Sequence, residues 1–315
     1  MKIKVNLTES SYNKLIEDIR LFKISKSDKT VNKNKFINML YKNYSLIYEK
    51  NMDKTINTIN TLVQDNELSK EIALKLQNDI ADSKNNYFNK SLTFILNEEN
   101  SIVFEDYEEN LMYISASAYF RNMIMEYLAY PQYKREEIIY QDRVDKILKA
   151  IEKKNIIHFK SKDTSVVFKP YKLGTSKEEL YSYLIGKNDK GGVVSYNISN
   201  IKDIIIKRDT FLFTDDEIKN FEDNIKNGIQ FPFSQPYKVT IKLTPKGMEI
   251  FERRYVNRPT PILVEGNKYT FCCSFYQLKS YFLAFGKECY IEGKTLRDSI
   301  SEEYLNTINM YNKKK

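Results

Sequence analysis

The sequence predicts a multidomain α+β protein, and three observations lead to this fold class. All nine glycines lie at or after Gly174, so the first half lacks the residue that most turns need and is expected to be largely helical. Five short β-branched or alternating runs follow one another within residues 155–207. At 315 residues, the chain is also long for a single hydrophobic core.

Residues 1–50 predict one strand followed by two helices. Lys2–Leu7 alternates polar and apolar side chains, as a half-buried strand does. Thr8 can cap the first helix, and a basic polar loop leads to the second. This order resembles the ribbon-helix-helix module, which binds DNA as a dimer. Because one edge strand with two short helices buries little apolar surface, the resemblance implies an obligatory homodimer paired through this strand.

The ribbon-helix-helix resemblance implies two groups of DNA-binding residues. Lys2, Lys4 and Asn6 would share the outward face of the ribbon, where Lys donates to guanine and Asn pairs with adenine in the major groove. Asn32, Lys33, Asn34 and Lys35 would offer free amides and ammonium groups to phosphate at the start of the second helix. The alternative is that residues 2–7 complete some other sheet and their lysines are merely solvated.

Residues 51–145 are predicted to be a helical spacer that couples the two ends and adds dimer contacts. This segment holds 9 Lys and Arg against 17 Asp and Glu, whereas residues 1–50 hold 11 against 5 and residues 146–315 hold 30 against 20. Basic ends and an acidic middle are expected if the ends contact polyanions and the middle does not. An AT-rich genome, which raises Lys content everywhere, is the alternative explanation.

The runs in residues 155–207 predict a small closed β-barrel within a domain spanning 146–212. The expected strands are short and joined by tight turns, including Asn188–Gly192. Pro170 is expected to stop the second strand. The five strands are Asn155–Lys160, Val166–Lys169, Leu180–Gly186, Val193–Ile198 and Lys202–Lys207.

This region resembles the WYL domain, an Sm-like ligand-sensing barrel of bacterial transcription regulators. Ser182-Tyr183-Leu184 keeps the last two residues of the tripeptide that names the family, with Ser in place of Trp. Ile156–Ser161 matches the family's opening strand, and Pro170–Leu173 matches its Pro-x-x-Leu. Asn197 and Asn200 stand where the family carries arginines, a departure that bears on anionic-ligand binding and not on the fold.

The predicted barrel has the composition of a surface for nucleic acid. Residues 146–210 hold 14 Lys and Arg against 7 Asp and Glu, interleaved with tyrosines. Cations follow a phosphate backbone and aromatic rings stack on bases, so the expected effector is anionic, a single-stranded nucleic acid or a nucleotide. An unknown small ligand, or a barrel that serves only as a dimer scaffold, are the alternatives. The candidate effector-binding residues are His158, Lys160, Tyr181, Tyr183, Tyr196 and Asn200.

The remaining residues predict a capped helix with a linker at 213–236 and an α+β sandwich at 237–315. Thr214 and Glu217 form a capping-box pattern, and Thr244-Pro245 predicts a helix start after the strand Tyr237–Leu243. The order of elements and the Phe285-Gly286 and Thr295-Leu296-Arg297 segments resemble the C-terminal extension that accompanies WYL domains.

Catalytic residues, metal ligands and cofactors are not expected, and the protein is not expected to be an enzyme. His158 is the single histidine, phosphate-binding glycine motifs are absent, and the three cysteines lack zinc-site spacing. The cysteine usage favours a cytoplasmic protein, and no apolar run is long enough to cross a membrane.

Together these patterns predict a homodimeric, ligand-responsive transcription regulator that binds a double-stranded operator through Lys2, Lys4 and Asn6. The alternative is a non-transcriptional nucleic-acid-sensing or defence accessory protein that uses its N-terminus only for dimerisation.

Overall fold

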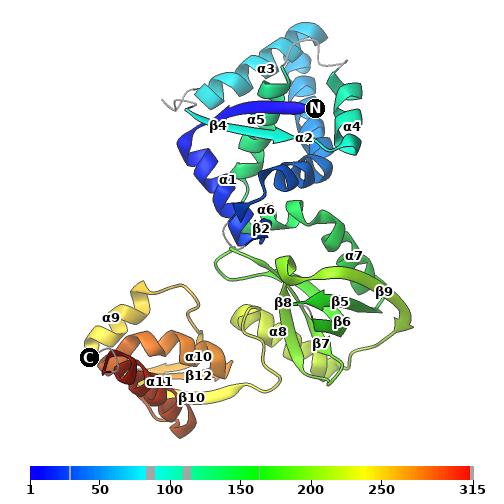
Figure 1. Cartoon of the computed structure of the whole chain (residues 1–315). Helices are drawn as coiled ribbons and strands as arrows, with labels where there is room; N and C mark the ends of the chain where they lie inside the picture. The colour runs from blue at the N-terminus through cyan, green and yellow to red at the C-terminus, as the bar shows by residue number, and fades with distance from the viewer. Residues whose placement is uncertain (28–29, 83–88, 109–114, 163, 313–315) are drawn as a thin grey trace. The chain divides into compact units, whose positions relative to one another are not determined.

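The computed structural model describes residues 1–27, 30–82, 89–108, 115–162 and 164–312. The chain divides into two compact units, unit 1 at Met1–Val144 and unit 2 at Asp145–Lys315 (Figure 1). Both units combine helices with antiparallel sheets, so the predicted mixture of helix and sheet is confirmed.

Unit 1 is mainly helical, but it contains a strand, β4, within the segment predicted to be a helical spacer. The boundary with unit 2 falls inside helix α7 (Gln141–Glu152). The other elements are β1 (Lys2–Leu7), α1 (Glu9–Leu21), β2 (Ser25–Ser27), β3 (Thr30–Val31), α2 (Lys33–Val63), α3 (Asn66–Asp82), β4 (Lys90–Ile95), α4 (Glu98–Glu108), α5 (Ala116–Ala129) and α6 (Gln132–Ile139).

Strand β1 pairs with β4 of the same chain along its whole length. The pairing is antiparallel, from Lys2 opposite Ile95 to Leu7 opposite Lys90, and Figure 1 shows the two strands side by side. The prediction that β1 has no partner until a second molecule supplies one is therefore wrong. An obligatory dimer was expected because β1 needed a strand partner. Since β4 provides the backbone groups that pair with β1, this physical reason no longer applies.

An aromatic core lies beneath the β1–β4 ribbon. Ile3, Val5 and Leu7 alternate inward from β1, and Leu92 and Phe94 do so from β4. Long aromatic side chains of α2 and α5 fill the space below them. Fully buried examples on these two helices are Phe36, Tyr41, Tyr44, Tyr48, Tyr119, Phe120 and Tyr127.

Unit 2 begins with a five-stranded antiparallel sheet in the order β8-β7-β6-β5-β9. The last strand returns to pair with the first, but β8 and β9 do not pair with each other. The sheet is therefore open, and the prediction of a closed barrel is wrong. The strands are β5 (Asn155–Ser161), β6 (Thr164–Thr175), β7 (Ser182–Asn188), β8 (Val193–Asn197) and β9 (Lys202–Thr210), with the 3-10 turn η1 (Ile198–Asn200) before β9.

Two small hydrophobic clusters cover the two faces of this sheet. On one face Ile147 and Ala150 of α7 pack with Ile157, Phe159 and residues near them. On the other face Phe221 and Ile229, from helix α8 (Asp215–Gly228) and its end, pack with Ile185 and Val193. Thr214 and Glu217 form the predicted capping box at the start of α8.

Strand β6 continues through Pro170, where it was predicted to stop. Pro170 pairs with Gly186 of β7, and the register shifts between Pro170 and Lys172. Pairing of β6 with β5 ends at Phe168, so the missing N–H of Pro170 removes no hydrogen bond on that side. The proline therefore produces a bulge and leaves the strand intact.

The C-terminal half of unit 2 is a second antiparallel sheet in the order β11-β12-β10-β13. Val239, Ile241 and Leu243 of β10 face a core shared with the helices, including Leu278 and Leu296. Strand β11 was not predicted, whereas the helix start at Thr244-Pro245 is confirmed. The elements are β10 (Tyr237–Leu243), α9 (Pro245–Arg253), β11 (Pro261–Glu265), β12 (Lys268–Cys273), α10 (Phe275–Phe282), η2 (Leu283–Glu288), β13 (Cys289–Ile291) and α11 (Lys294–Asn312).

Two features are absent from the residues that the structure describes. None of their helices has both the length and the apolar character that crossing a bilayer requires. In the same residues, no three His, Cys, Asp or Glu side chains lie close enough together to hold a metal ion.

Candidate nucleic-acid interface

The outer face of β1 brings together the three residues predicted to contact bases. Lys2, Lys4 and Asn6 are exposed, while the residues between them are buried. The alternation follows from the strand geometry, because successive side chains point to opposite faces. These three side chains form one polar row with two positive charges.

Strand β4 supplies the other half of the same face, which was not predicted. Ser91, Thr93 and Ile95 are exposed and lie opposite Asn6, Lys4 and Lys2 in the ladder. The signal was present in the sequence, since Ser91–Ile95 alternates polar and apolar residues up to its last position. The exposed side chains of β1 and β4 together are called the ribbon face below.

The start of α2 differs from the prediction because most of its polar groups already have partners within the chain. The side chain of Asn32 caps the helix by accepting the Lys35 amide at 3.0 Å, so this amide is not free for phosphate. Asn34 accepts the Ile95 amide at 3.2 Å. The Lys33 ammonium donates to the Tyr12 hydroxyl at 2.6 Å. Of the four predicted residues, Lys35 presents an exposed cation.

The six candidate effector residues of unit 2 do not form one cluster. His158 and Lys160 share one face of β5, and Lys160 forms an exposed ion pair with Asp203 at 3.2 Å. Tyr196 lies on the opposite face, with its ring 5.0 Å from that of Phe159 in an edge-on contact. Burial raises the pKa of the Tyr196 phenol, which fits a side chain that belongs to the core.

Asn197 and Asn200 lie at the two ends of the turn η1. The Asn197 side chain accepts the Ser199 amide at 3.0 Å and caps the turn, a local role that a short amide side chain performs and arginine cannot. Asn200 is the last residue of the turn. The two asparagines thus each have a place in the local backbone structure of this turn.

Tyr181 and Tyr183 line a cavity of about 270 Å³ with Phe231 and several polar residues. The Glu178 carboxylate accepts the Asn257 amide at 2.6 Å and the Gln230 side chain at 3.3 Å. Among the described residues that line this cavity there is a carboxylate but no ammonium or guanidinium group. Its chemistry therefore disfavours a phosphate and suits an uncharged ring or a hydrogen-bond donor, in contrast to the predicted anionic effector.

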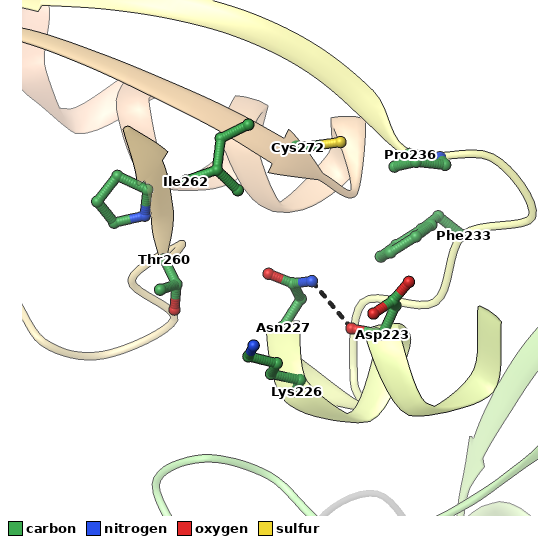
Figure 2. A pocket seen from close by; sticks show the side chains of 9 residues that line it. Asp223, Lys226, Asn227, Phe233, Pro236, Thr260, Ile262 and Cys272 are labelled. Carbon is green, nitrogen blue, oxygen red and sulfur yellow. Dashed lines mark hydrogen bonds between the residues drawn. The ribbon is translucent and has the colours of Figure 1, made fainter. Parts of the chain in front are cut away.

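A larger cavity of about 440 Å³ lies between α8 and the C-terminal sheet, at a place that no sequence pattern indicated. In Figure 2 the side chains of Cys272 and Ile262 lie on the sheet side, opposite Asn227 of α8, and Phe233 closes one end. The Asn227 amide donates to the Asp223 carbonyl at 2.9 Å. Lys226 and Asp223 supply one charge of each sign, so the cavity has no net preference for an anion.

Comparisons with known proteins identify the fold of the chain and no more. No protein-family model matches the sequence, and no curated protein matches it either. A solved structure titled "Crystal structure of a CRISPR Cas-related protein" aligns over 100% of this chain and 95% of its own, with a TM-score of 0.76 and 18% identity. The proteasome accessory factor B/C of Arthrobacter aurescens covers 59% of this chain and 31% of its own at 15% identity, and its TM-score of 0.24 carries no argument. The chain thus shares the fold of a CRISPR Cas-related protein along its whole length.

Proposed function

We propose that this protein is a regulatory nucleic-acid-binding protein that docks its ribbon face on duplex DNA and responds to a ligand of unit 2. The observation that carries the proposal is the ribbon face itself. A two-stranded antiparallel ribbon fits the major groove, and this ribbon presents Lys2, Lys4 and Asn6 on its solvent side. The apolar side chains on the other side of the ribbon are already buried against the aromatic core. Docking on DNA therefore requires no rearrangement of unit 1.

The resemblance of residues 155–210 to WYL domains supports a ligand-responsive regulator. The support is the strand order, in which the five strands follow one another along the chain and the last pairs with the first, although the sheet is open. The cavity beside Tyr181 and Tyr183 is a place for a regulatory ligand. Binding there would act by shifting the population of two states of the chain, without covalent chemistry.

The experiment is a mobility-shift titration of genomic duplex fragments at several salt concentrations. Lys2→Ala with Lys4→Ala should weaken binding and lower the slope of log affinity against log salt by about one to two, because each cation lost from the interface leaves about one phosphate less neutralised and removes about 0.9 from the slope. Lys50→Ala with Lys54→Ala is the matched control, since both lysines are exposed on the distal part of α2. An equal slope in the ribbon variant and the control would exclude the ribbon face as the DNA contact.

A second function, single-stranded nucleic-acid sensing in a defence system, has two supporting observations. Residues 146–315 carry 30 Lys and Arg against 20 Asp and Glu, and the structural neighbour's title places that neighbour among CRISPR Cas-related proteins. This function does not need the ribbon face. It predicts binding to single-stranded RNA or DNA that survives Lys2→Ala with Lys4→Ala, so the same titration with single strands distinguishes the two.

A further inference from the structure

In unit 1 a strand followed by two helices occurs twice along the chain, if the short strands β2 and β3 are left aside. The first set is β1, α1 and α2, and the second is β4, α4 and α5. A polar residue caps the helix that follows each strand. Thr8 accepts the Ser11 amide at 3.1 Å, and Asn97 accepts the Asn100 amide at 3.0 Å. The two sets are joined by a connection that includes α3, and we call them the first and second halves of unit 1.

The second helix of each half is bonded to the strand of the other half. Ser117 of α5 donates from its hydroxyl to the Lys4 carbonyl at 2.9 Å. Asn38 of α2 donates to the Ile95 carbonyl of β4 at 2.9 Å. These reciprocal contacts are what a two-fold arrangement of two equivalent halves would produce.

The same two helices pack directly on each other through aromatic rings. Phe36 of α2 lies 6.0 Å from Tyr127 of α5, and Tyr41 lies 5.4 Å from Phe120. Tyr48 of α2 lies 5.3 Å from Tyr119. Two paired strands with the two second helices packed against each other are the parts of a ribbon-helix-helix pair, and here both halves come from one chain.

We propose that one copy of the chain reads a non-palindromic duplex site, because the two strands of its ribbon carry different side chains. This inference rests on the proposed function. In a homodimer both strands present the same residues and therefore select a palindrome. Here β1 offers Lys4 and Asn6, which suit guanine and adenine, whereas β4 offers Thr93 and Ile95, which suit the methyl group of thymine.

The two halves of unit 1 also differ in the charges that their helix starts carry next to the ribbon face. Lys35 stands exposed in the first turn of α2, in the first half. In the second half, α5 begins at Ala116 after its cap Ser115, and neither residue carries a charge. Helix α4 begins with the exposed Glu98 and Glu99, against the single exposed Glu9 at the start of α1 in the first half. The end of the ribbon beside the start of α2, where the Asn34 side chain accepts the Ile95 amide, is therefore held more strongly by the DNA phosphates than the opposite end.

The test is selection of a random duplex library with the full-length chain, followed by the mass of the selected complex. We expect a non-palindromic motif and one chain per duplex. Asn6→Ala should flatten base preference on one side of the motif and lower affinity roughly ten-fold, and Ile95→Ala should flatten the other side, because the Asn6–Ser91 and Lys2–Ile95 pairs lie at opposite ends of the ribbon. Lys54→Ala, an exposed change on α2 away from the ribbon, should leave the motif unchanged.

The outcomes separate this inference from the function beneath it. A palindromic motif with two chains per duplex, whose two sides both change in Asn6→Ala, overturns the inference and leaves duplex recognition standing. The absence of any enriched duplex sequence overturns the proposed function, and this inference falls with it. A non-palindromic motif whose two sides respond to the two variants separately supports both.

Discussion

The Asp18 and Arg135 side chains form an ion pair inside unit 1, between α1 and α6. Their side chains are 1% and 6% exposed, and the guanidinium bonds both carboxylate oxygens, with Nε–Oδ2 at 2.7 Å and Nη2–Oδ1 at 2.8 Å. The Tyr127 hydroxyl donates to the same carboxylate at 3.0 Å. Burial raises the pKa of this phenol well above its ordinary value, so Tyr127 stays protonated and remains a donor at neutral pH.

Breaking this pair should cost unit 1 much of its stability. Arg135→Met leaves the Asp18 carboxylate buried without its cation, so we expect the free energy of unfolding to fall by about 3–5 kcal/mol. Replacing both residues, as Asp18→Leu with Arg135→Met, should cost less than the single change. Urea unfolding followed by circular dichroism, with hydrogen exchange of α1 as the local readout, measures the difference.

The exposed ion pair of Lys42 and Asp142 provides the control within the same unit. Its side chains are 50% and 68% exposed, so Lys42→Ala should change stability by less than about 1 kcal/mol. Equal losses in Arg135→Met and Lys42→Ala would show that the buried pair contributes nothing beyond a surface contact.

At the scale of elements, the pairing of β6 with β7 depends on a close approach of the two backbones at Gly186. A Cβ built on Gly186 would lie 2.1 Å from the Lys169 carbonyl oxygen and 2.8 Å from the Phe168 ring. Gly186 pairs with Pro170 beside the bulge, where β6 bends and the two backbones approach each other. The strand can pass through a proline here because its neighbour has no side chain.

Gly186→Ala should therefore destabilise unit 2 by about 1–3 kcal/mol, as other overpacked core positions do. Gly192→Ala is the matched control, because its Cβ would meet only the Asn188 side chain at 3.4 Å, an ordinary contact. Thermal unfolding of both variants gives the comparison. A melting temperature of Gly186→Ala equal to that of the wild type would contradict this explanation of the bulge.

Local patterns in the sequence predicted those elements whose cause is local. The capping box at Thr214 and the alternation of Tyr237–Leu243 depend on neighbouring residues, and both are present in the structure. The pairing of β1 with β4 joins residues that are far apart in the chain, and no pattern within β1 identifies its partner. The alternation of Ser91–Ile95 was available, but it is short and lies between helical segments.

In the candidate site too, the sequence predicted what depends on local alternation and did not predict what depends on tertiary packing. The outward row of Lys2, Lys4 and Asn6 follows from alternation alone, and the structure has it. Predicting the effector residues correctly would have required knowing which face of each strand is covered by other elements. Tyr196 points into the core because α7 covers that face, a tertiary fact that strand periodicity does not contain.

At the scale of the whole molecule, the ribbon is complete within one chain, because β1 and β4 both belong to unit 1. A second copy is then unnecessary for folding of unit 1 or for presenting the ribbon face. Any self-association of the protein must come from other surfaces.

Cross-linking of Lys4→Cys with Thr93→Cys tests this claim most directly, because the two residues are paired across the ribbon. The variant is made with Cys272→Ser and Cys289→Ser, and unlabelled and nitrogen-15-labelled copies are unfolded together, refolded as an equal mixture and treated with a short bis-maleimide. We predict a cross-link within single chains, with no product that joins a labelled to an unlabelled copy. Cross-linked peptides that combine the two isotopes, at about half of the product, would show that the ribbon forms between two molecules and would contradict an intramolecular ribbon.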